Sequence, residues 1–364
     1  MKTKANSKIS ILLVIGLIGL IIIILALLKI YGISKFTVPS PATLEVMKRP
    51  FLNIYDNQDR KLNVVFITHP FTRDETIKEY EDAKAKGVQF LGMSSYCEFP
   101  GIVSNPHDIL HDPNNPAWKW DYFKMVRGWC HCFKRPEKFI PSSSGLPLAL
   151  ISESDFGNHA AHQPSTVPMA EREYDFIYVC LKDNDKCEDG WQAYNRNWDK
   201  AKEYLDIMCD KYKLKGLLIG RINCEIPKSC HNMMELTDFQ EYHQFIGNYS
   251  KCKFIFLPNY CDASPRVMTE AMCFGLPILV NSEIVGGWKY VAPETGAEFT
   301  HENFEDTLKV FLENLENYRP REWFISNYGV ENAGPRLLEF VRQCIPQSEL
   351  NIDLNKVKWL KPGI

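Results

Sequence analysis

The sequence has neither a long basic run nor an excess of positive charge. Its 42 lysines and arginines are outnumbered by 45 aspartates and glutamates, and the formal net charge is −3 at pH 7. Nucleic-acid-binding proteins concentrate positive charge on one face or along one segment, so this composition excludes nucleic acid as the main partner. Internal repeats are absent too, and low complexity is confined to one apolar run near the amino terminus.

Paired cysteines at zinc-finger spacing are missing as well. Cys130 and Cys132 are separated by one residue, which is too short a gap for a shared tetrahedral zinc ion, and no second pair stands at finger distance. The sequence therefore predicts no metal site. All 12 cysteines follow residue 28, and we expect them to be buried, or disulfide-bonded if that side of the chain is oxidising.

Residues 9–28 contain no charge and consist mainly of isoleucine and leucine. At about 1.5 Å per helical residue, such a run crosses a hydrocarbon core of roughly 30 Å, so it predicts a transmembrane helix. No small-residue cleavage site follows it, which favours an uncleaved anchor over a signal peptide. The lysines of residues 1–8 favour a cytoplasmic amino terminus. We therefore expect a type II membrane protein of the Golgi or endoplasmic reticulum with its main part in the lumen.

The rest of the chain is long enough for two domains of ordinary size. A Pro-containing stretch after Ala160 suggests a linker between them. The expected divisions are a stem at 29–60, an amino-terminal domain at 61–165, a carboxy-terminal domain at 172–345 and a tail at 346–364.

Alternating apolar runs and turn residues predict an α/β fold. In the first domain, apolar runs at 62–68 and 88–92 flank a charged helix at 73–86, which is typical of a βαβ unit with a parallel sheet. A further helix is expected near 120–133.

The second domain shows a more regular alternation, which predicts a doubly wound sheet with its ligand beyond the carboxyl ends of the strands. An aromatic stripe from Trp191 to Tyr212 has gaps of three and four and indicates a helix whose stripe packs in the core. The expected strands are 174–181, 214–220, 253–257 and 276–281, and the other expected helices are 239–250 and 265–274.

The most informative stretch is 262–281. Ser264 and Pro265 are residue types that favour the start of a helix, as N-cap and first helical residue. Such a helix directs its free N–H groups and positive dipole end toward a cleft, where a diphosphate could bind. Arg266 could add a charge-assisted bond, while Asp262 and Glu270 could bond sugar hydroxyls. The pattern predicts a site for a sugar nucleotide.

The stretch 262–281 resembles the signature of the retaining GT-B glycosyltransferases of family four, also called glycosyl group 1 transferases. In that signature an acidic residue and seven others precede a glutamate, followed by alanine, a Gly-x-Pro turn and a strand. The resemblance implies a GT-B-like fold of two Rossmann-type doubly wound domains, here preceded by one transmembrane helix. It covers about residues 174–345.

The same resemblance implies the site residues of a metal-independent transferase with a nucleotide-diphosphate sugar as co-substrate and no other cofactor. Asp262 would hold the sugar near its reacting carbon, Glu270 would bond the nucleotide ribose, and a histidine of the first domain, for which His159 is the candidate, would face the sugar. The remaining donor-binding residues would be Ser264, Arg266, Val267, Lys182 and Lys186, with Arg196 as a more distant cation.

The sequence departs from the family pattern at three points. The first acid is Asp262 rather than glutamate, Pro265 replaces a glycine, and the arginine expected after the strand at 174–181 is missing. The first domain, which carries the acceptor site in the family, matches poorly. The acceptor is therefore left open as a glycan, lipid or protein.

Three other interpretations fit part of the sequence. An inverting transferase of the exostosin or fucosyltransferase type would need a general base, for which His159, Asp155 or Glu153 could serve. A GT-A enzyme would use the Asp183-Asn-Asp185 triplet to bind a metal. A non-catalytic carbohydrate-binding or scaffold protein would keep the fold without turnover.

Overall fold

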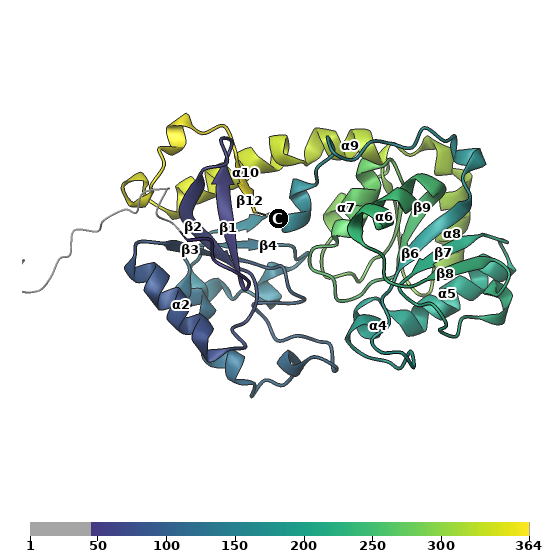
Figure 1. Ribbon diagram of the computed structural model, residues 1–364, viewed down its shortest axis with the longest axis horizontal. Coiled ribbons are helices and arrows are strands. Elements are labelled where there is room, and N and C mark those ends of the chain that lie inside the picture. Colours follow the sequence, from purple (N-terminus) through teal and green to yellow (C-terminus); the bar gives the residue numbers. More distant parts are fainter. Residues whose placement is uncertain (1–44, 364) are drawn as a thin grey trace, which may run out of the picture.

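The computed structural model describes residues 45–363 as two α/β domains joined side by side (Figure 1). The expected anchor at 9–28 and the expected cytoplasmic tail at 1–8 lie outside these described residues. Within 45–363, no helix combines the length and the apolar character needed to cross a membrane.

The first domain contains a six-stranded mixed sheet with the order β12-β1-β2-β3-β4-β5. Strands β2 to β5 are parallel, whereas β1 runs antiparallel to both β2 and β12. The strands are β1 (Phe51–Asp56), β2 (Lys61–Ile67), β3 (Gln89–Met93), β4 (Trp129–His131), β5 (Leu148–Leu150) and β12 (Leu360–Pro362), and the helices are α2 (Asp74–Ala85) and α3 (Tyr122–Met125).

The second domain contains a fully parallel sheet with the order β11-β10-β9-β6-β7-β8, the doubly wound arrangement that the sequence predicts. The strand order reverses between β6 and β9, where ligands of such sheets usually bind. Its strands are β6 (Tyr174–Val179), β7 (Gly216–Ile219), β8 (Met234–Thr237), β9 (Cys252–Leu257), β10 (Ile278–Asn281) and β11 (Gly296–Phe299).

Helices cover both faces of this second sheet. One face packs Phe176, Phe254 and Phe256 against the apolar stripe of α5, and the other packs Ile255 and Ile278 against the helix after β9. Burial of both faces explains why the four inner strands are mostly apolar, whereas the edge strands β8 and β11 are partly exposed. The helices are α4 (Trp191–Asn195), α5 (Trp198–Asp210), α6 (Tyr242–Gly247), α7 (Arg266–Cys273), α8 (Phe304–Glu313), α9 (Pro320–Asn327) and α10 (Val330–Cys344).

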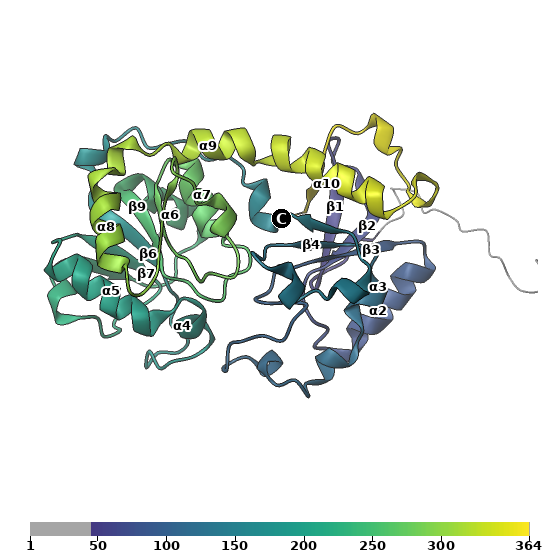
Figure 2. The ribbon, with the colours of Figure 1, turned by 180° about the vertical axis from the view of Figure 1, so that it is seen from behind.

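The chain returns to the first domain at its end. Helices α9 and α10 run one after the other along one side of both domains, and the view from behind shows the same arrangement (Figures 1 and 2). Leu337 and Val341 of α10 are fully buried against Ile54 and Phe66 of the first sheet. Helix α10 therefore ties the two domains together although it follows the second one in sequence.

Three expected boundaries differ from the structure. Residues 51–56, placed by the sequence in the stem at 29–60, form β1 inside the first sheet, because Phe51 and Ile54 are buried there. The expected tail at 346–364 contains β12, which pairs with β1. Helix α10, placed by the sequence in the second domain at 172–345, packs on the first.

The expected helix at 120–133 is also different. Its residues form the short helix α3 and then strand β4, which pairs with β3 on one side and β5 on the other. Trp129 is fully buried in this strand, so tertiary packing overrides the local helical pattern.

Two disulfides, Cys187–Cys224 and Cys209–Cys230, lie in the second domain. The other cysteines are free and buried. The cysteines are thus either disulfide-bonded or buried as free thiols, which are the two states that the sequence leaves open.

A chain that begins at residue 61 lacks β1 and leaves the edges of β2 and β12 unpaired. This chain lacks the buried side chains of Phe51, Leu52 and Ile54, and the burial of each contributes about 1.5–3 kcal/mol. We therefore expect it to aggregate or to unfold at a much lower temperature. A chain that begins at residue 45 should fold. Solubility after expression and thermal unfolding followed by circular dichroism test the difference, and equal behaviour of the two chains would contradict the role of β1.

Candidate functional site

The candidate site lies where the two domains face each other. The carboxyl ends of β6 and β9, at the reversal point of the second sheet, lead to the tip of α7. The carboxyl ends of the parallel strands of the first sheet, together with the 3-10 helix η6 (Glu153–Phe156), approach from the other side. Direct contacts join the two edges, including hydrogen bonds from Trp288 Nε1 to the carbonyl of Cys132 and between the hydroxyls of Ser154 and Ser264, both 2.7 Å long.

Helix α7 begins at Arg266, and its N-cap is Pro265. No side chain caps it, so the N–H groups of its first turn have no side-chain acceptor. The sequence predicts Ser264 as the N-cap, which is wrong: its hydroxyl instead accepts from the backbone N–H of Ser154 at 3.0 Å. The N–H of Met268 already donates to the carbonyl of Pro265 at 3.1 Å, so Arg266 and Val267 provide the remaining donors at this positive dipole end, as an anion site requires.

Asp262 is held by two side chains just before α7. Its carboxylate accepts from Arg196 Nη1 at 2.6 Å and from the amide of Asn259 at 3.0 Å. Burial alone would lower the pKa of Arg196, but the Asp262 carboxylate raises it, so the guanidinium stays charged. Arg196 directly follows α4 and places a cation beside Asp262. The arginine that the family pattern has after β6 is missing in this chain.

Glu270 lies in the second turn of α7 and has different partners. Its two carboxylate oxygens accept from the hydroxyls of Tyr242 and Tyr249, each at 3.4 Å. Burial raises the pKa of Glu270, while the charge of Arg266 and the tyrosine hydroxyls oppose the rise. Within the described residues, no hydrogen bond joins Glu270 to Asp262. The two acids flank the start of one helix with separate sets of contacts.

The predicted cations have different environments. Lys182 follows β6, is half-buried, and lies 3.2 Å from Asp185 and 3.9 Å from Asp238. Lys186 is exposed in the loop before α4. Arg266 is exposed at the start of α7, and Val267, next to it, is partly buried against the core of the second domain. Of the cations that the sequence proposes, Arg196 has the firmest contact with a predicted site acid.

His159 does not lie beside these residues. Its Nδ1 is buried without a hydrogen-bond partner, close to Gly329, and its carbonyl accepts from Arg321 at 3.0 Å. It lines a cavity of about 460 Å³ together with Trp359 and Lys361, and none of the predicted donor-binding residues lines that cavity. The structure places His159 beside the short connection between α9 and α10 rather than at the tip of α7.

Two other histidines lie at the carboxyl edge of the first sheet, and sequence reasoning did not select them. His69 follows β2 and contacts Thr68 Oγ1 at 2.8 Å, and its pKa is lowered to about 4 by burial and by Arg49. His131 ends β4, and burial together with the charge of Lys289 lowers its pKa to about 4. Both imidazoles are therefore neutral at pH 7. The sequence offered a signal only for His69, which follows the apolar run at 62–68; His131 lies in the stretch 120–133, where the sequence predicts a helix.

A buried ion pair joins the domains behind the site. Lys289 Nζ lies 2.6 Å from Asp155 Oδ1, and the two side chains are 3% and 0% exposed. Asp155 also accepts from the hydroxyl of Tyr290 at 2.5 Å and from the backbone N–H of Ser152 at 3.2 Å. Because Asp155 comes from the first domain and Lys289 from the second, this pair fixes one domain against the other.

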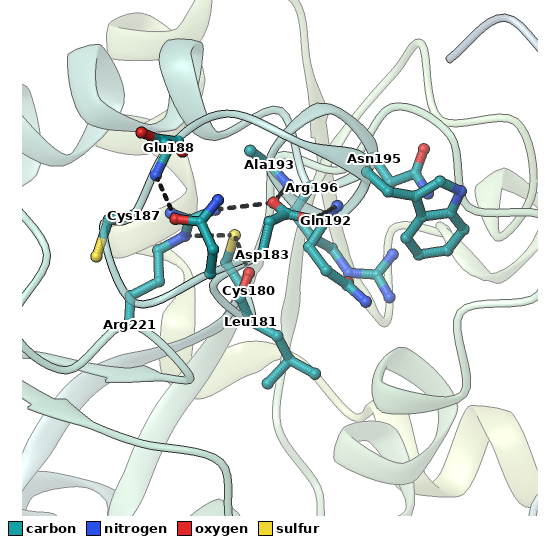
Figure 3. A network of polar contacts seen from close by, with 12 residues as sticks. Cys180, Leu181, Asp183, Cys187, Glu188, Gln192, Ala193, Asn195, Arg196 and Arg221 are labelled. Atoms are coloured by element: carbon teal, nitrogen blue, oxygen red, sulfur yellow. Dashed lines mark hydrogen bonds and ion pairs between the residues drawn. The ribbon is translucent and has the colours of Figure 1, made fainter. Parts of the chain in front are cut away.

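The Asp183-Asn-Asp185 triplet has a structural contact rather than an open ligand set. Asp183 accepts from the backbone N–H groups of Gln192 and Ala193 at 2.7 and 2.9 Å and so holds the start of α4 (Figure 3). In the same network, Arg221 Nε donates to Cys180 Sγ at 3.0 Å. The Arg221–Cys180 bond connects the loops after β6 and β7. Because both oxygens of Asp183 already accept from backbone N–H groups, the structure gives the GT-A interpretation no support.

No protein-family model matches the sequence, and no curated protein matches it. The fold does resemble solved structures. A TarM variant from S. aureus, determined with fondaparinux, alpha-GlcNAc-glycerol and UDP, has a TM-score of 0.51 and 13% identity, over 70% of this chain and 50% of that one. HepE from Anabaena, in complex with UDP, gives 0.51 and 9%, over 76% of this chain and 78% of that one.

A third match is the lipopolysaccharide outer core galactosyltransferase WaaB, with a TM-score of 0.50 and 11% identity over 77% of this chain and 75% of that one. The chain spans only about half of the TarM structures, 50% and 54% of their lengths. At these identities the likeness concerns the fold. The chain has a two-domain α/β fold of the GT-B type, as the sequence predicts. The expectation that both domains are doubly wound is wrong for the first one, because its sheet is mixed and the order of its parallel strands does not reverse.

Proposed function

We propose that this protein is a glycosyltransferase that transfers a sugar from a nucleotide-diphosphate sugar to a carbohydrate, lipid or protein acceptor. The observation that carries the proposal is the uncapped tip of α7 between two partly buried acids, Asp262 and Glu270, at the reversal point of a doubly wound sheet. The GT-B fold of solved structures that contain UDP supports it.

In this proposal the diphosphate binds at the tip of α7. The N–H groups of Arg266 and Val267 would donate to its oxygens, and Arg266 in the first turn of α7 and Lys182 after β6 would be the cations that contribute charge. These groups stabilise the negative charge that develops on the leaving diphosphate, which is an electrostatic role that needs no metal ion.

We therefore expect activity to persist in the presence of EDTA. Activity that disappears on treatment with EDTA and returns with a divalent cation would contradict the metal-independent role.

Glu270 would bond the ribose hydroxyls. Its oxygens already accept from two tyrosine hydroxyls, which shows that the carboxylate is oriented to accept from O–H donors. Asp262, held by Arg196, would accept from the sugar close to the reacting carbon. The acceptor would attack on the face that the diphosphate leaves, with retention of configuration. An inverted product would instead favour Glu153 as general base, since Asp155 is already paired with Lys289.

Replacing Glu270 tests the donor site. We expect the intact chain to release free nucleotide from one member of a panel of nucleotide sugars, and Glu270→Ala to lower the affinity for that nucleotide about 10- to 100-fold, the loss of a charged hydrogen bond of about 1.5–3 kcal/mol. Glu313→Ala, an exposed acid at the end of α8, is the matched control. Nucleotide release is followed by chromatography and affinity by calorimetry.

Three outcomes would decide against the proposal. Binding of a nucleotide sugar without release or transfer would favour a non-catalytic carbohydrate-binding protein. Unchanged affinity of a folded Glu270→Ala variant would remove Glu270 from the donor site. The absence of binding to every nucleotide sugar of the panel would remove the function altogether.

We also infer that residues 9–28 anchor the protein as a type II membrane protein of the Golgi or endoplasmic reticulum. Its uncharged apolar run and the two disulfides of the second domain support a lumenal position. The sequon Asn248-Tyr-Ser250 does not serve as a glycosylation marker of the lumenal side, because Asn248 is buried and donates to Gln240 at 2.6 Å.

We expect the full chain to stay in the membrane pellet after alkaline carbonate extraction and to resist protease in sealed vesicles. Release by carbonate, or digestion in sealed vesicles, would contradict the anchor.

A further inference from the structure

A second contact between the domains brings two cysteines together from opposite sides. Cys97 follows β3 in the first domain, and Cys261 follows β9 in the second, directly before Asp262. Both are free and are only 4% and 3% exposed. Their sulfur atoms and a carboxylate oxygen of Glu98 all lie within 4.8 Å of one another. Two thiols at this separation are close enough to form a bond after a small adjustment.

The backbone around both cysteines is held in place by polar contacts across the interface. Asn105 donates to the side chain of Asn195 at 2.9 Å, and Trp191 Nε1 donates to Asp108 at 2.7 Å. On the second domain, the N–H of Tyr260 donates to the carbonyl of Asn195 at 2.9 Å. The nearness of the two thiols is therefore a result of how the domains dock.

Cys97 has a backbone that only a few non-glycine residues adopt. Its φ of 41° lies in the left-handed region. Such a conformation persists where the surroundings determine it, and such positions gather at functional sites. Here it belongs to the turn in which Cys97 and the adjacent Glu98 approach the same point, next to Cys261.

We propose that Cys97 and Cys261 form a disulfide that cross-links the two domains. The same chain already contains Cys187–Cys224 and Cys209–Cys230, so its environment is one in which disulfides form. Buried Glu98 accepts from the thiol of Cys261 at 3.4 Å and from Ser104 Oγ at 2.5 Å. Its carboxylate is placed to receive the proton when the thiol becomes a thiolate.

The reaction is a thiol–disulfide exchange with a small disulfide such as oxidised glutathione. The thiolate of Cys261 attacks one sulfur of the oxidant, forms a mixed disulfide and releases one thiol. Cys97 then displaces the second half of the oxidant and completes the cross-link. Two electrons pass from the cysteine sulfurs to the oxidant, and the two cysteine protons leave on two released thiols.

The cross-link has a mechanical consequence. Helices α9 and α10 join the domains along one side, as Figures 1 and 2 show. A bond between Cys97 and Cys261 would join them at a second place, one residue from Asp262. The domains could then no longer separate at that place, and the loop before α7 would stay against the first domain.

The test is made on the full chain, isolated without reductant in the presence of an alkylating agent and then digested. We expect mass spectrometry to find a peptide pair joined through Cys97 and Cys261, either directly or after incubation with oxidised glutathione. Cys261→Ser should lose this pair and leave Cys97 alkylated. Cys252→Ser, which removes a buried thiol of β9 in the core of the second domain, should keep the pair and is the matched control.

Recovery of both Cys97 and Cys261 as alkylated thiols after oxidation, with the two other disulfides intact, would overturn the proposal. So would one equivalent of zinc bound to the unsubstituted chain and released when Cys97 and Cys261 are alkylated, because the cluster would then be a metal site. Both results come from the unsubstituted chain, so a variant that fails to fold does not affect them. The readout needs no glycosyl transfer and is independent of the proposed function.

Discussion

The ion pair between Asp155 and Lys289 is the constraint on which the arrangement of the two domains depends. Both side chains are almost fully buried, and each comes from a different domain. A buried charge without its partner costs several kcal/mol, so neither group can leave the other without a large penalty. Arg336 of α10 lies 4.0 Å from the same carboxylate. The pair therefore links the two sheets and the returning helix at one point.

The candidate site follows from this docking. With the domains held together, η6 of the first domain meets the start of α7, and the hydroxyls of Ser154 and Ser264 bond each other. The start of α7 and the acids around it then lie at the boundary of the two domains, which is where the proposed donor and acceptor would meet. Arg196 completes the second-domain side by holding Asp262.

The sequence predicted the four inner strands of the second domain well because they are buried on both faces, which leaves a strong local apolar signal. It missed the edge strands β8 and β11, which are partly exposed and contain polar residues. It failed where the signal is not local. Strand β1 was assigned to the stem because Pro50 and the mixed charges around it are typical of a linker, and one of its two partner strands, β12, lies about 300 residues later in the chain. The contacts of Ser264 with Ser154 and of Asp262 with Arg196 also depend on docking or loop geometry that no spacing reveals. His159 was chosen for its place after a strand, yet the chain carries it to the short connection between α9 and α10.

A double-mutant cycle on Asp155 and Lys289 tests the central claim most directly. The free energy of unfolding is measured by chemical denaturation for Asp155→Asn, Lys289→Met and the double variant. The account predicts a loss of about 3–5 kcal/mol for Lys289→Met, which removes the closest cation from the buried carboxylate. It also predicts that the double variant loses less stability than the sum of the two single losses. Small, additive losses below about 1 kcal/mol, the range of an exposed pair such as Lys134 and Glu298, would contradict it.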